Sequence, residues 1–202
     1  MDYYQRHSQA YFDETVGVDP APFLNPFAER LFAGARVLDV GCGSGRDLLW
    51  LKSRGVIATG VERSQGLAAL ARTHSGCPVM VGDFETVDFS ALQVDAVMCC
   101  GSLVHVSHER LEWALKNIVM AFRDDAPPTG PEEARDRQIL YVSLKEGQGA
   151  STDDRGRIFY YWQDEALRAI FAGLGFEVAD FLRSPSADGE GKSWLGYVLV
   201  RP

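Results

Sequence analysis

The sequence has no C-x-x-C pair among its four cysteines. The four residues, each in or beside an apolar run, are Cys42, Cys77, Cys99 and Cys100. Isolated thiols in apolar surroundings are typical of reduced protein interiors, so the pattern argues against a disulfide framework. We therefore expect a cytoplasmic protein without a bound metal.

Long hydrophobic runs are also absent. No stretch approaches the roughly 18 apolar residues that a membrane helix requires. The opening residues, MDYYQRHSQAYFDE, lack the apolar core of a signal peptide. The sequence therefore predicts no membrane partner.

Basic charge is scarce. The chain has 20 Lys and Arg against 28 Asp and Glu, which gives a formal net charge of -8. A protein that neutralises the phosphates of duplex nucleic acid usually presents a basic surface. The charge balance therefore argues against a nucleic-acid partner.

The length and composition fit one globular domain. The chain has 202 residues, of which 46% are hydrophobic. A chain of this length can bury roughly 70% of its unfolded surface without a disulfide or a metal. We predict a single domain over residues 1–202, divided into an N-terminal helical lid (1–33) and a core (34–202).

Short β-branched runs alternate with amphipathic stretches in the core. Strands are predicted at 36–40, 56–60, 79–81, 95–99, 138–144, 177–182 and 195–200. Helices are predicted at 46–53, 64–73, 107–122 and 164–174. This alternation is the pattern of an α/β fold, in which helices cover both faces of a mostly parallel sheet.

Two segments fall outside the alternation. Residues 1–33 are rich in tyrosine and phenylalanine, which predicts one or two helices packed at the carboxyl edge of the sheet. Residues 124–137, DDAPPTGPEEARDR, combine prolines and acids without a periodic apolar stripe. They are predicted to form a mobile surface loop.

The most specific pattern is a glycine-rich turn after the first predicted strand. Gly41, Gly43 and Gly45 stand at alternate positions between that strand and a helix. Glycines there accept positive φ angles and let a ligand approach the backbone. Glu62 ends the second strand, where a carboxylate can accept hydrogen bonds from a ribose diol. These features alone fit either a dinucleotide or another adenosine-bearing ligand.

The glycine spacing separates these two ligands. In a G-x-G-x-x-G dinucleotide fingerprint that starts at Gly41, the third glycine position is Arg46, and from Gly43 it is Leu48. Asp39 precedes the turn, where an acid is out of place beside a pyrophosphate but suits a ligand with an amino group and a sulfonium. The spacing therefore disfavours a nicotinamide dinucleotide.

The segment Asp39-Val40-Gly41-Cys42-Gly43-Ser44-Gly45 resembles the first motif, D/E-x-G-x-G-x-G, of the class I S-adenosylmethionine-dependent methyltransferases. The similarity extends over residues 36–200, with Glu62 after the second strand and Asp83 after the third. It implies a Rossmann-like, doubly wound, seven-stranded and mostly parallel sheet with a terminal antiparallel strand. It also implies S-adenosylmethionine as cofactor, released as S-adenosylhomocysteine.

The resemblance assigns roles to matching residues. Glu62 is expected to bind the ribose hydroxyls and Asp83 the adenine amine, with Phe84 beside the adenine ring. Asp39 is expected to orient the methionine amino group near the glycine turn. The full set of predicted cofactor-binding residues is Asp39, Gly41, Cys42, Gly43, Gly45, Glu62, Arg63, Asp83, Phe84, Cys100, Gly101 and Ser102.

His105 and His108 form an H-x-x-H pair near the start of a predicted helix. No acidic or cysteine ligand accompanies them, so we expect no metal there. His105 is the candidate catalytic residue, because many small-molecule members of the family carry a histidine near the transferred methyl. It can act as a base for the acceptor proton or fix the loop by hydrogen bonding, and the sequence leaves both roles open.

Four aromatic residues are candidates for a substrate site or a lid: Tyr4, Tyr11, Tyr160 and Trp162. Aromatic faces can contact the sulfonium cation or an aromatic substrate. Ordinary packing is the alternative for all four.

We therefore expect an enzyme that transfers the sulfonium methyl to a small-molecule nucleophile by in-line displacement, as a monomer or homodimer. Two alternatives stay open. One is a non-catalytic cofactor-binding partner subunit, and the other is a methyltransferase acting on a macromolecule. The sequence identifies neither the acceptor nor the atom that is methylated.

Overall fold

The computed structural model describes residues 3–123, 138–185 and 193–201. The predicted loop at 124–137 lies outside the described residues. The main sheet contains β1 (Arg36–Val40), β2 (Ile57–Glu62), β3 (Val79–Val81), β4 (Ala96–Cys100), β5 (Gln138–Lys145), β8 (Glu177–Pro185) and β9 (Ser193–Arg201). The α-helices are α1 (Tyr3–Arg6), α2 (Ser8–Thr15), α3 (Ala21–Ala28), α4 (Arg46–Lys52), α5 (Gln65–Ser75), α6 (His108–Ile118) and α7 (Asp164–Gly173).

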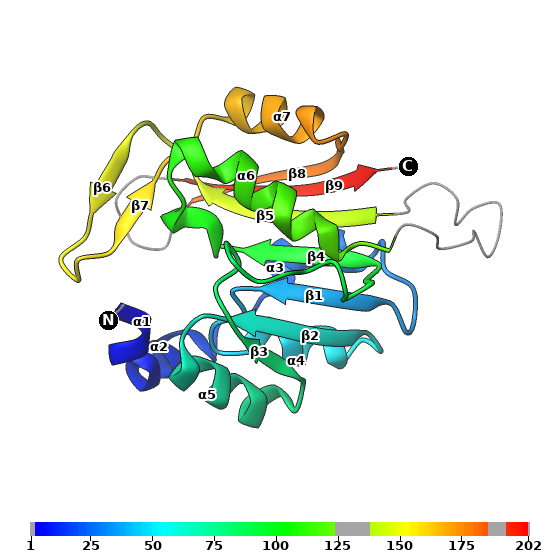
Figure 1. Ribbon diagram of the computed structural model, residues 1–202, viewed down its shortest axis with the longest axis vertical. Helices are drawn as coiled ribbons and strands as arrows, with labels where there is room; N and C mark the ends of the chain where they lie inside the picture. Colours follow the sequence, from blue (N-terminus) through cyan, green and yellow to red (C-terminus); the bar gives the residue numbers. More distant parts are fainter. Residues whose placement is uncertain (1–2, 124–137, 186–192, 202) are drawn as a thin grey trace.

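The seven strands lie in the order β3-β2-β1-β4-β5-β9-β8 (Figure 1). The pairs formed by β1 to β5 are parallel, whereas β9 runs antiparallel to both β5 and β8. This topology confirms the predicted seven-stranded, mostly parallel sheet with an antiparallel terminal strand. The two strands of the last hairpin are longer than predicted, because polar residues beyond their apolar centres also join the ladder.

Helices cover both faces of the sheet. On one face, α3, α4 and α5 pack against alternate strand residues such as Val37. On the other face, Leu115 of α6 and Phe171 of α7 belong to one buried cluster with strand residues such as Leu38. Figure 1 shows α6 in front of the sheet and α3 and α4 behind it. The predicted doubly wound arrangement is confirmed.

Local sequence explains where α5 begins and ends. Ser64 caps α5 by accepting a hydrogen bond from the backbone N–H of Leu67, and Gly76 ends this helix in the left-handed conformation. The helix predicted at 107–122 is α6 followed by a short 3-10 turn, η2 (Val119–Ala121). Another 3-10 turn, η1 (Leu103–His105), follows β4.

A second, two-stranded sheet was not predicted. β6 (Ala150–Thr152) and β7 (Ile158–Tyr160) pair in an antiparallel hairpin between β5 and α7. Each strand has three residues, too few for the alternation of polar and apolar residues to stand out in the sequence. This hairpin extends beyond the carboxyl edge of the main sheet (Figure 1).

The N-terminal segment is helical, as predicted, but it forms three helices. α2 packs closely on α5. A Cβ on Gly66 of α5 would lie only 2.4 Å from the Oγ of Ser8 on α2, so glycine is needed at this contact. The ring of Phe12 contacts His74 at the other end of α5, with ring centroids 5.7 Å apart. Helices α1 and α2 are thereby fixed beside the carboxyl ends of β1 and β2.

Candidate functional site

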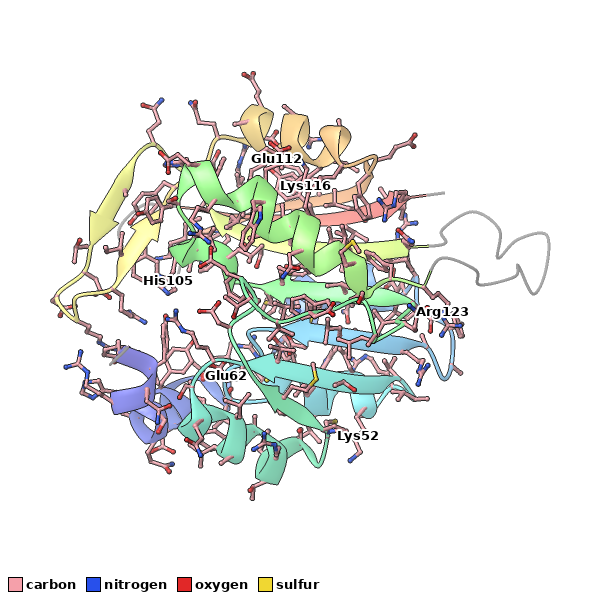
Figure 2. All side chains as sticks on the ribbon, viewed as in Figure 1. Lys52, Glu62, His105, Glu112, Lys116 and Arg123 are labelled. Carbon is pink, nitrogen blue, oxygen red and sulfur yellow. The ribbon has the colours of Figure 1, made fainter. Side chains whose placement is uncertain are left out.

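A cleft lies at the carboxyl ends of β1, β2 and β4, and we call it the first cleft. Figure 2 shows Glu62 and His105 near the same end of the sheet, on opposite sides of the opening. The lining residues are Tyr4, Tyr11, Gly41, Gly43, Val61, Glu62, Arg63, Leu67, Gly82, Asp83, Phe84, Glu85, Cys100, Gly101, Ser102, His105 and Val106. Ligands of open α/β sheets bind in this position, outside the carboxyl ends of the strands.

The glycine-rich turn forms the floor of the first cleft. Gly41 and Gly43 both have positive φ angles, 74° and 52°. A Cβ on Gly41 would lie 2.4 Å from the Cβ of Ser102, so the turn and the loop after β4 approach as closely as backbones allow. Over Gly43, the nearest atom to a Cβ would be a ring carbon of Tyr11, at 3.5 Å. A glycine is therefore required at the first position for packing, and at the second it keeps the floor open.

Two other members of the predicted motif lie beneath the cleft instead of lining it. A Cβ on Gly45 would lie 2.9 Å from the backbone of Ala71, so this glycine allows the start of α4 to pack against α5. The side chain of Cys42 is buried against Gly60 of β2. The prediction placed both among the cofactor-binding residues, whereas the structure shows packing contacts for their side-chain positions.

Glu62 holds the end of β2 to the glycine-rich turn. Its Oε2 accepts a hydrogen bond from the backbone N–H of Gly43 at 3.0 Å, and its Oε1 accepts one from the N–H of Ser64 at 2.8 Å. The residue is only 8% exposed, yet it lines the cleft. Its carboxylate is thereby fixed in one orientation beside the floor.

Asp39 is almost completely buried below the turn. Its Oδ2 has no hydrogen-bond partner among the described residues. Burial, together with the nearby carboxylate of Asp47, raises the pKa of Asp39 well above its usual range. Asp47 itself binds the guanidinium of Arg46 through two hydrogen bonds of 2.6 and 2.9 Å. Asp39 is therefore a buried acid with one oxygen, Oδ2, that accepts no hydrogen bond from the part of the chain that the structure describes.

The far end of the cleft is formed by the segment after β3. Asp83 and Phe84 line it, and the Oδ1 of Asp83 accepts a hydrogen bond from the backbone N–H of Glu85. The guanidinium of Arg63 lies 3.4 Å from Asp83 and is largely exposed. The structure thus brings these predicted residues to one end of the cleft, next to Glu62.

The loop after β4 forms the opposite wall. The backbone N–H of Gly101 donates to the Oγ of Ser143 on β5, which fixes the chain as it leaves the strand. The Oγ of Ser102 is buried and has no hydrogen-bond partner among the described residues. Cys100 completes this wall, and burial raises the pKa of its thiol, so it stays protonated.

His105 lines the cleft with both ring nitrogens engaged. Its Nδ1 lies 2.5 Å from the carbonyl oxygen of Ile158 on β7, and its Nε2 lies 2.6 Å from the hydroxyl of Tyr4. Because a carbonyl oxygen can only accept, the neutral imidazole carries its proton on Nδ1. The Tyr4 hydroxyl then donates to Nε2. His105 therefore joins the N-terminal helix α1 to the β6–β7 hairpin.

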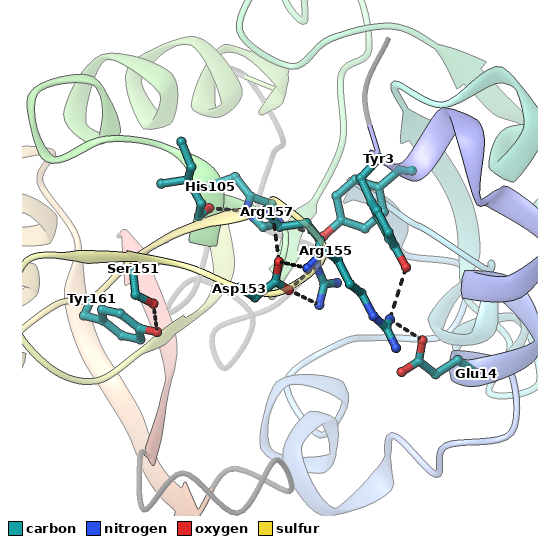
Figure 3. A network of polar contacts seen from close by, with 10 residues as sticks. Tyr3, Glu14, His105, Ser151, Asp153, Arg155, Arg157 and Tyr161 are labelled. Carbon is teal, nitrogen blue, oxygen red and sulfur yellow. Dashed lines mark hydrogen bonds and ion pairs between the residues drawn. The ribbon is translucent and has the colours of Figure 1, made fainter.

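Further contacts join the N-terminal helices and the hairpin across the opening (Figure 3). Arg155, at the tip of the hairpin, donates to the hydroxyl of Tyr3 at 3.1 Å and to Glu14 at 2.9 Å. The guanidinium of Arg157 lies 5.1 Å from the ring centroid of Tyr3 and is held by Asp153. These are surface contacts, which contribute little to stability individually.

Of the four aromatic candidates, the structure brings two to the cleft. Tyr4 and Tyr11 line it, with their rings edge to face at 5.0 Å. Trp162 is buried in the core, and its backbone N–H donates to the carbonyl oxygen of Lys145. Tyr160 places its ring 5.5 Å from that of His108. For Tyr160 and Trp162, the structure therefore shows ordinary packing, which was the alternative to a substrate or lid role.

Five lining residues were missed by the sequence analysis: Val61, Leu67, Gly82, Glu85 and Val106. Val61, Gly82, Glu85 and Val106 are each adjacent in sequence to a predicted site residue. Leu67, in the first turn of α5, carries no sequence signal for the site.

Two absences concern the described ranges of the chain. Within 3–123, 138–185 and 193–201, no group of three or more His, Cys, Asp or Glu side chains is arranged to hold a metal ion. His105 and His108 bind separate carbonyl oxygens, of Ile158 and Tyr161. No helix in these ranges is long and apolar enough to cross a membrane.

Comparison with known proteins agrees with this geometry. A family profile described as "Methyltransferase domain" matches residues 37–125. An uncharacterized methyltransferase of Geobacillus sp. (strain WCH70) is 26% identical over 88% of this chain and 86% of its own length. The ubiquinone biosynthesis O-methyltransferase of Coxiella burnetii is 35% identical over 49% of this chain and 47% of its own length.

A solved structure shares the fold over nearly the whole chain. It is the 1,6-didemethyltoxoflavin-N1-methyltransferase of Burkholderia thailandensis, with bound 1,6-didemethyltoxoflavin and S-adenosylhomocysteine. The TM-score is 0.71 at 20% identity, and the match covers 98% of this chain and 83% of that chain. Fold and site define a Rossmann-like protein with an open cleft at a glycine-rich turn. The family match, these relatives and the shared fold support the resemblance to the class I S-adenosylmethionine-dependent methyltransferases that the sequence predicted.

Proposed function

We propose that this chain transfers a methyl group from S-adenosylmethionine, bound in the first cleft, to a small-molecule nucleophile. The observation that carries this proposal is the position of Glu62. Its buried carboxylate is fixed next to Gly43 by two backbone hydrogen bonds, and it borders an open cleft. A carboxylate held in this way is suited to accept hydrogen bonds from a ribose diol.

The other cleft residues fit the two ends of the cofactor. Asp39, a buried acid whose Oδ2 has no hydrogen-bond partner in the described part of the chain, is suited to the cationic amino group, directly or through water. The Oγ of Ser102, which has no hydrogen-bond partner among the described residues, is available to the methionine end, and Cys100 and Gly101 border the same part of the cleft. At the other end, Asp83 and Phe84 are suited to the adenine amine and ring.

When bound, the cofactor supplies an electrophilic methyl carbon on its sulfonium sulfur. The protein therefore mainly has to align the acceptor and exclude water. Tyr4 and Tyr11 cover the cleft, and the contacts between the N-terminal helices and the hairpin hold them there. We propose that α1 and α2, within the predicted lid of residues 1–33, act as the lid on the domain, whereas α3 packs on the sheet as part of its core.

His105 is proposed to receive the acceptor proton through Tyr4. The Nε2 of a neutral His105 already accepts the Tyr4 hydroxyl, so it can take the phenolic proton as Tyr4 takes one from the acceptor. The carbonyl of Ile158 on Nδ1 stabilises the imidazolium that results. The route is needed only for an acceptor that is protonated at neutral pH.

A small acceptor is favoured over a macromolecule for two reasons. The acidic chain provides no general attraction for nucleic acid. The named relative from Coxiella burnetii and the Burkholderia thailandensis enzyme carry the names of small-molecule methyltransferases. A non-catalytic partner subunit has no observation in its favour.

The test of this proposal is an assay with a methyl-labelled cofactor and a pool of metabolites, with the product identified by mass. We expect a labelled small molecule to form. In the His105→Gln variant, turnover should fall about 100-fold or more and the acidic limb of the pH–rate profile should disappear, while S-adenosylhomocysteine affinity stays within a factor of about three. Wild-type turnover in this variant would reject the proton route. Absence of any labelled product with the wild type would reject methyl transfer to a small molecule.

A further inference from the structure

A second cleft adjoins the first at the carboxyl ends of β4 and β5. Tyr11, Cys100 and Gly101 line both clefts, so one short stretch of wall separates them. The second cleft contains about 1000 Å³ of space, part of it open to solvent. Its remaining walls come from α3, the start of α4, and the β8–β9 hairpin.

Aromatic and apolar side chains form most of these walls. Trp194 on β9 lies next to the wall that the two clefts share. A Cβ on Gly101, which lines both clefts, would be 3.3 Å from the indole ring. Phe23, Tyr141, Leu182 and Pro185 complete the apolar lining. A glycine with a φ of 64° at position 101 lets the indole ring contact the loop that borders both clefts. A flat ring bound against Trp194 would therefore reach the wall shared with the first cleft.

The lining of the second cleft offers little to an ion, although the ammonium of Lys145, which does not line it, lies 5.6 Å from the Trp194 ring centroid. Among the described residues, the lining of the second cleft contains one cationic side chain, Arg46, and no carboxylate. The guanidinium of Arg46 is already paired with both carboxylate oxygens of Asp47, and it lies 5.4 Å from the Phe23 ring centroid. Because this positive charge is compensated, an anionic ligand gains little from it and would lose its hydration.

Polar groups are nevertheless present on the β5 side. The Oγ of Ser143 accepts the N–H of Gly101, and Tyr141 lies beside it. Burial raises the pKa of Tyr141, so its hydroxyl remains a neutral hydrogen-bond donor. A hydroxyl or ring nitrogen of a neutral ligand can be oriented by such groups.

We propose that the second cleft is the acceptor site and that the acceptor is a flat, uncharged aromatic or heteroaromatic ring. This inference rests on the proposed function, because it names the substrate class of the same enzyme. Trp194 is the residue that determines this specificity, by contacting the ring face next to the shared wall. Stacking and burial against an indole favour planar ligands over aliphatic ones of the same size.

The test uses calorimetric titration with 1-naphthol, 1-naphthoate and cyclohexanol, in the presence and absence of S-adenosylhomocysteine. We expect saturable binding of 1-naphthol, at least about tenfold tighter than that of the other two compounds. Trp194→Ala should weaken 1-naphthol binding about tenfold or more. Trp113→Ala, at an exposed tryptophan on α6 on the opposite face of the sheet, is the matched control and should leave it unchanged.

If Trp194→Ala does not fold, Leu182→Asp replaces it, because a carboxylate in the apolar wall should also abolish 1-naphthol binding. Unchanged affinity in a folded Trp194→Ala or Leu182→Asp protein would overturn the proposal, as would tighter binding of 1-naphthoate. S-Adenosylhomocysteine is titrated in parallel. Wild-type protein that binds it but not 1-naphthol overturns the acceptor site alone, whereas protein that binds only 1-naphthol overturns the proposed function.

Discussion

Replacement of Glu62 by alanine separates ligand binding from support of the fold. The side chain makes two short hydrogen bonds to backbone N–H groups, at 3.0 and 2.8 Å, and is proposed to hold the ribose hydroxyls. A lost charge-assisted hydrogen bond costs about 1–3 kcal/mol, so the dissociation constant of S-adenosylhomocysteine should rise about 5- to 150-fold. The two backbone donors also lose their acceptor, so the free energy of unfolding should fall by about 1–3 kcal/mol.

The assay is calorimetric titration with S-adenosylhomocysteine, combined with urea unfolding of the same proteins. Glu85→Ala is the matched control, since Glu85 lines the same cleft with the same charge but forms an ion pair with Arg110 at 2.7 Å. Its affinity should change less than twofold. Unchanged affinity in Glu62→Ala, or an equal loss in Glu85→Ala, would refute the ribose assignment.

Three further predictions concern the turn, the buried acid and the lid. Gly45→Ala should lower the free energy of unfolding by more than Gly34→Ala. Both glycines have positive φ angles, so an alanine at either position costs about 1–2 kcal/mol, but only a Cβ at position 45 meets the backbone of another helix. Equal urea midpoints for the two variants would contradict this. The raised pKa of Asp39 means that the folded state keeps a proton that the unfolded chain has lost above about pH 4, so native stability falls as pH rises. Asp39→Asn should remove this pH dependence, so the stability of the variant relative to the wild type should increase from pH 4 to pH 7. A difference in the free energy of unfolding that stays constant over this range would contradict the prediction. Hydrogen exchange across residues 3–15 should slow when S-adenosylhomocysteine binds, and less so in Arg155→Ala; equal protection with and without ligand would mean that the segment is simply packed structure.

Local sequence patterns predicted the elements that position the site. The apolar run of β1 ends in glycines whose φ angles are positive, and Glu62 ends β2, so the floor of the first cleft follows from neighbouring residues. Asp83 and Gly101 were placed in the same way, by their positions after strands. These features depend on contacts close in sequence or on the regular geometry of parallel strands.

Contacts between distant segments account for what was missed. The close approach of Gly45 to Ala71 depends on how two helices pack, and it makes this glycine a packing residue instead of a lining one. Trp162 is buried in the core, and its backbone pairs with Lys145 on β5, a contact between separate elements that the sequence pattern does not indicate. The link from His105 to Tyr4 joins residues 101 positions apart, and no periodicity in the sequence indicates it.

The central claim is that the first cleft binds S-adenosylmethionine over its glycine floor. The most direct measurement is calorimetric titration of S-adenosylhomocysteine into wild type and Gly43→Val, with circular dichroism to show that both are folded. A valine side chain on Gly43 would project toward Tyr11 and fill the space above the turn. We predict one site per chain in the wild type and no detectable heat in the folded variant. Equal titration curves, or no binding to the wild type, would contradict the claim.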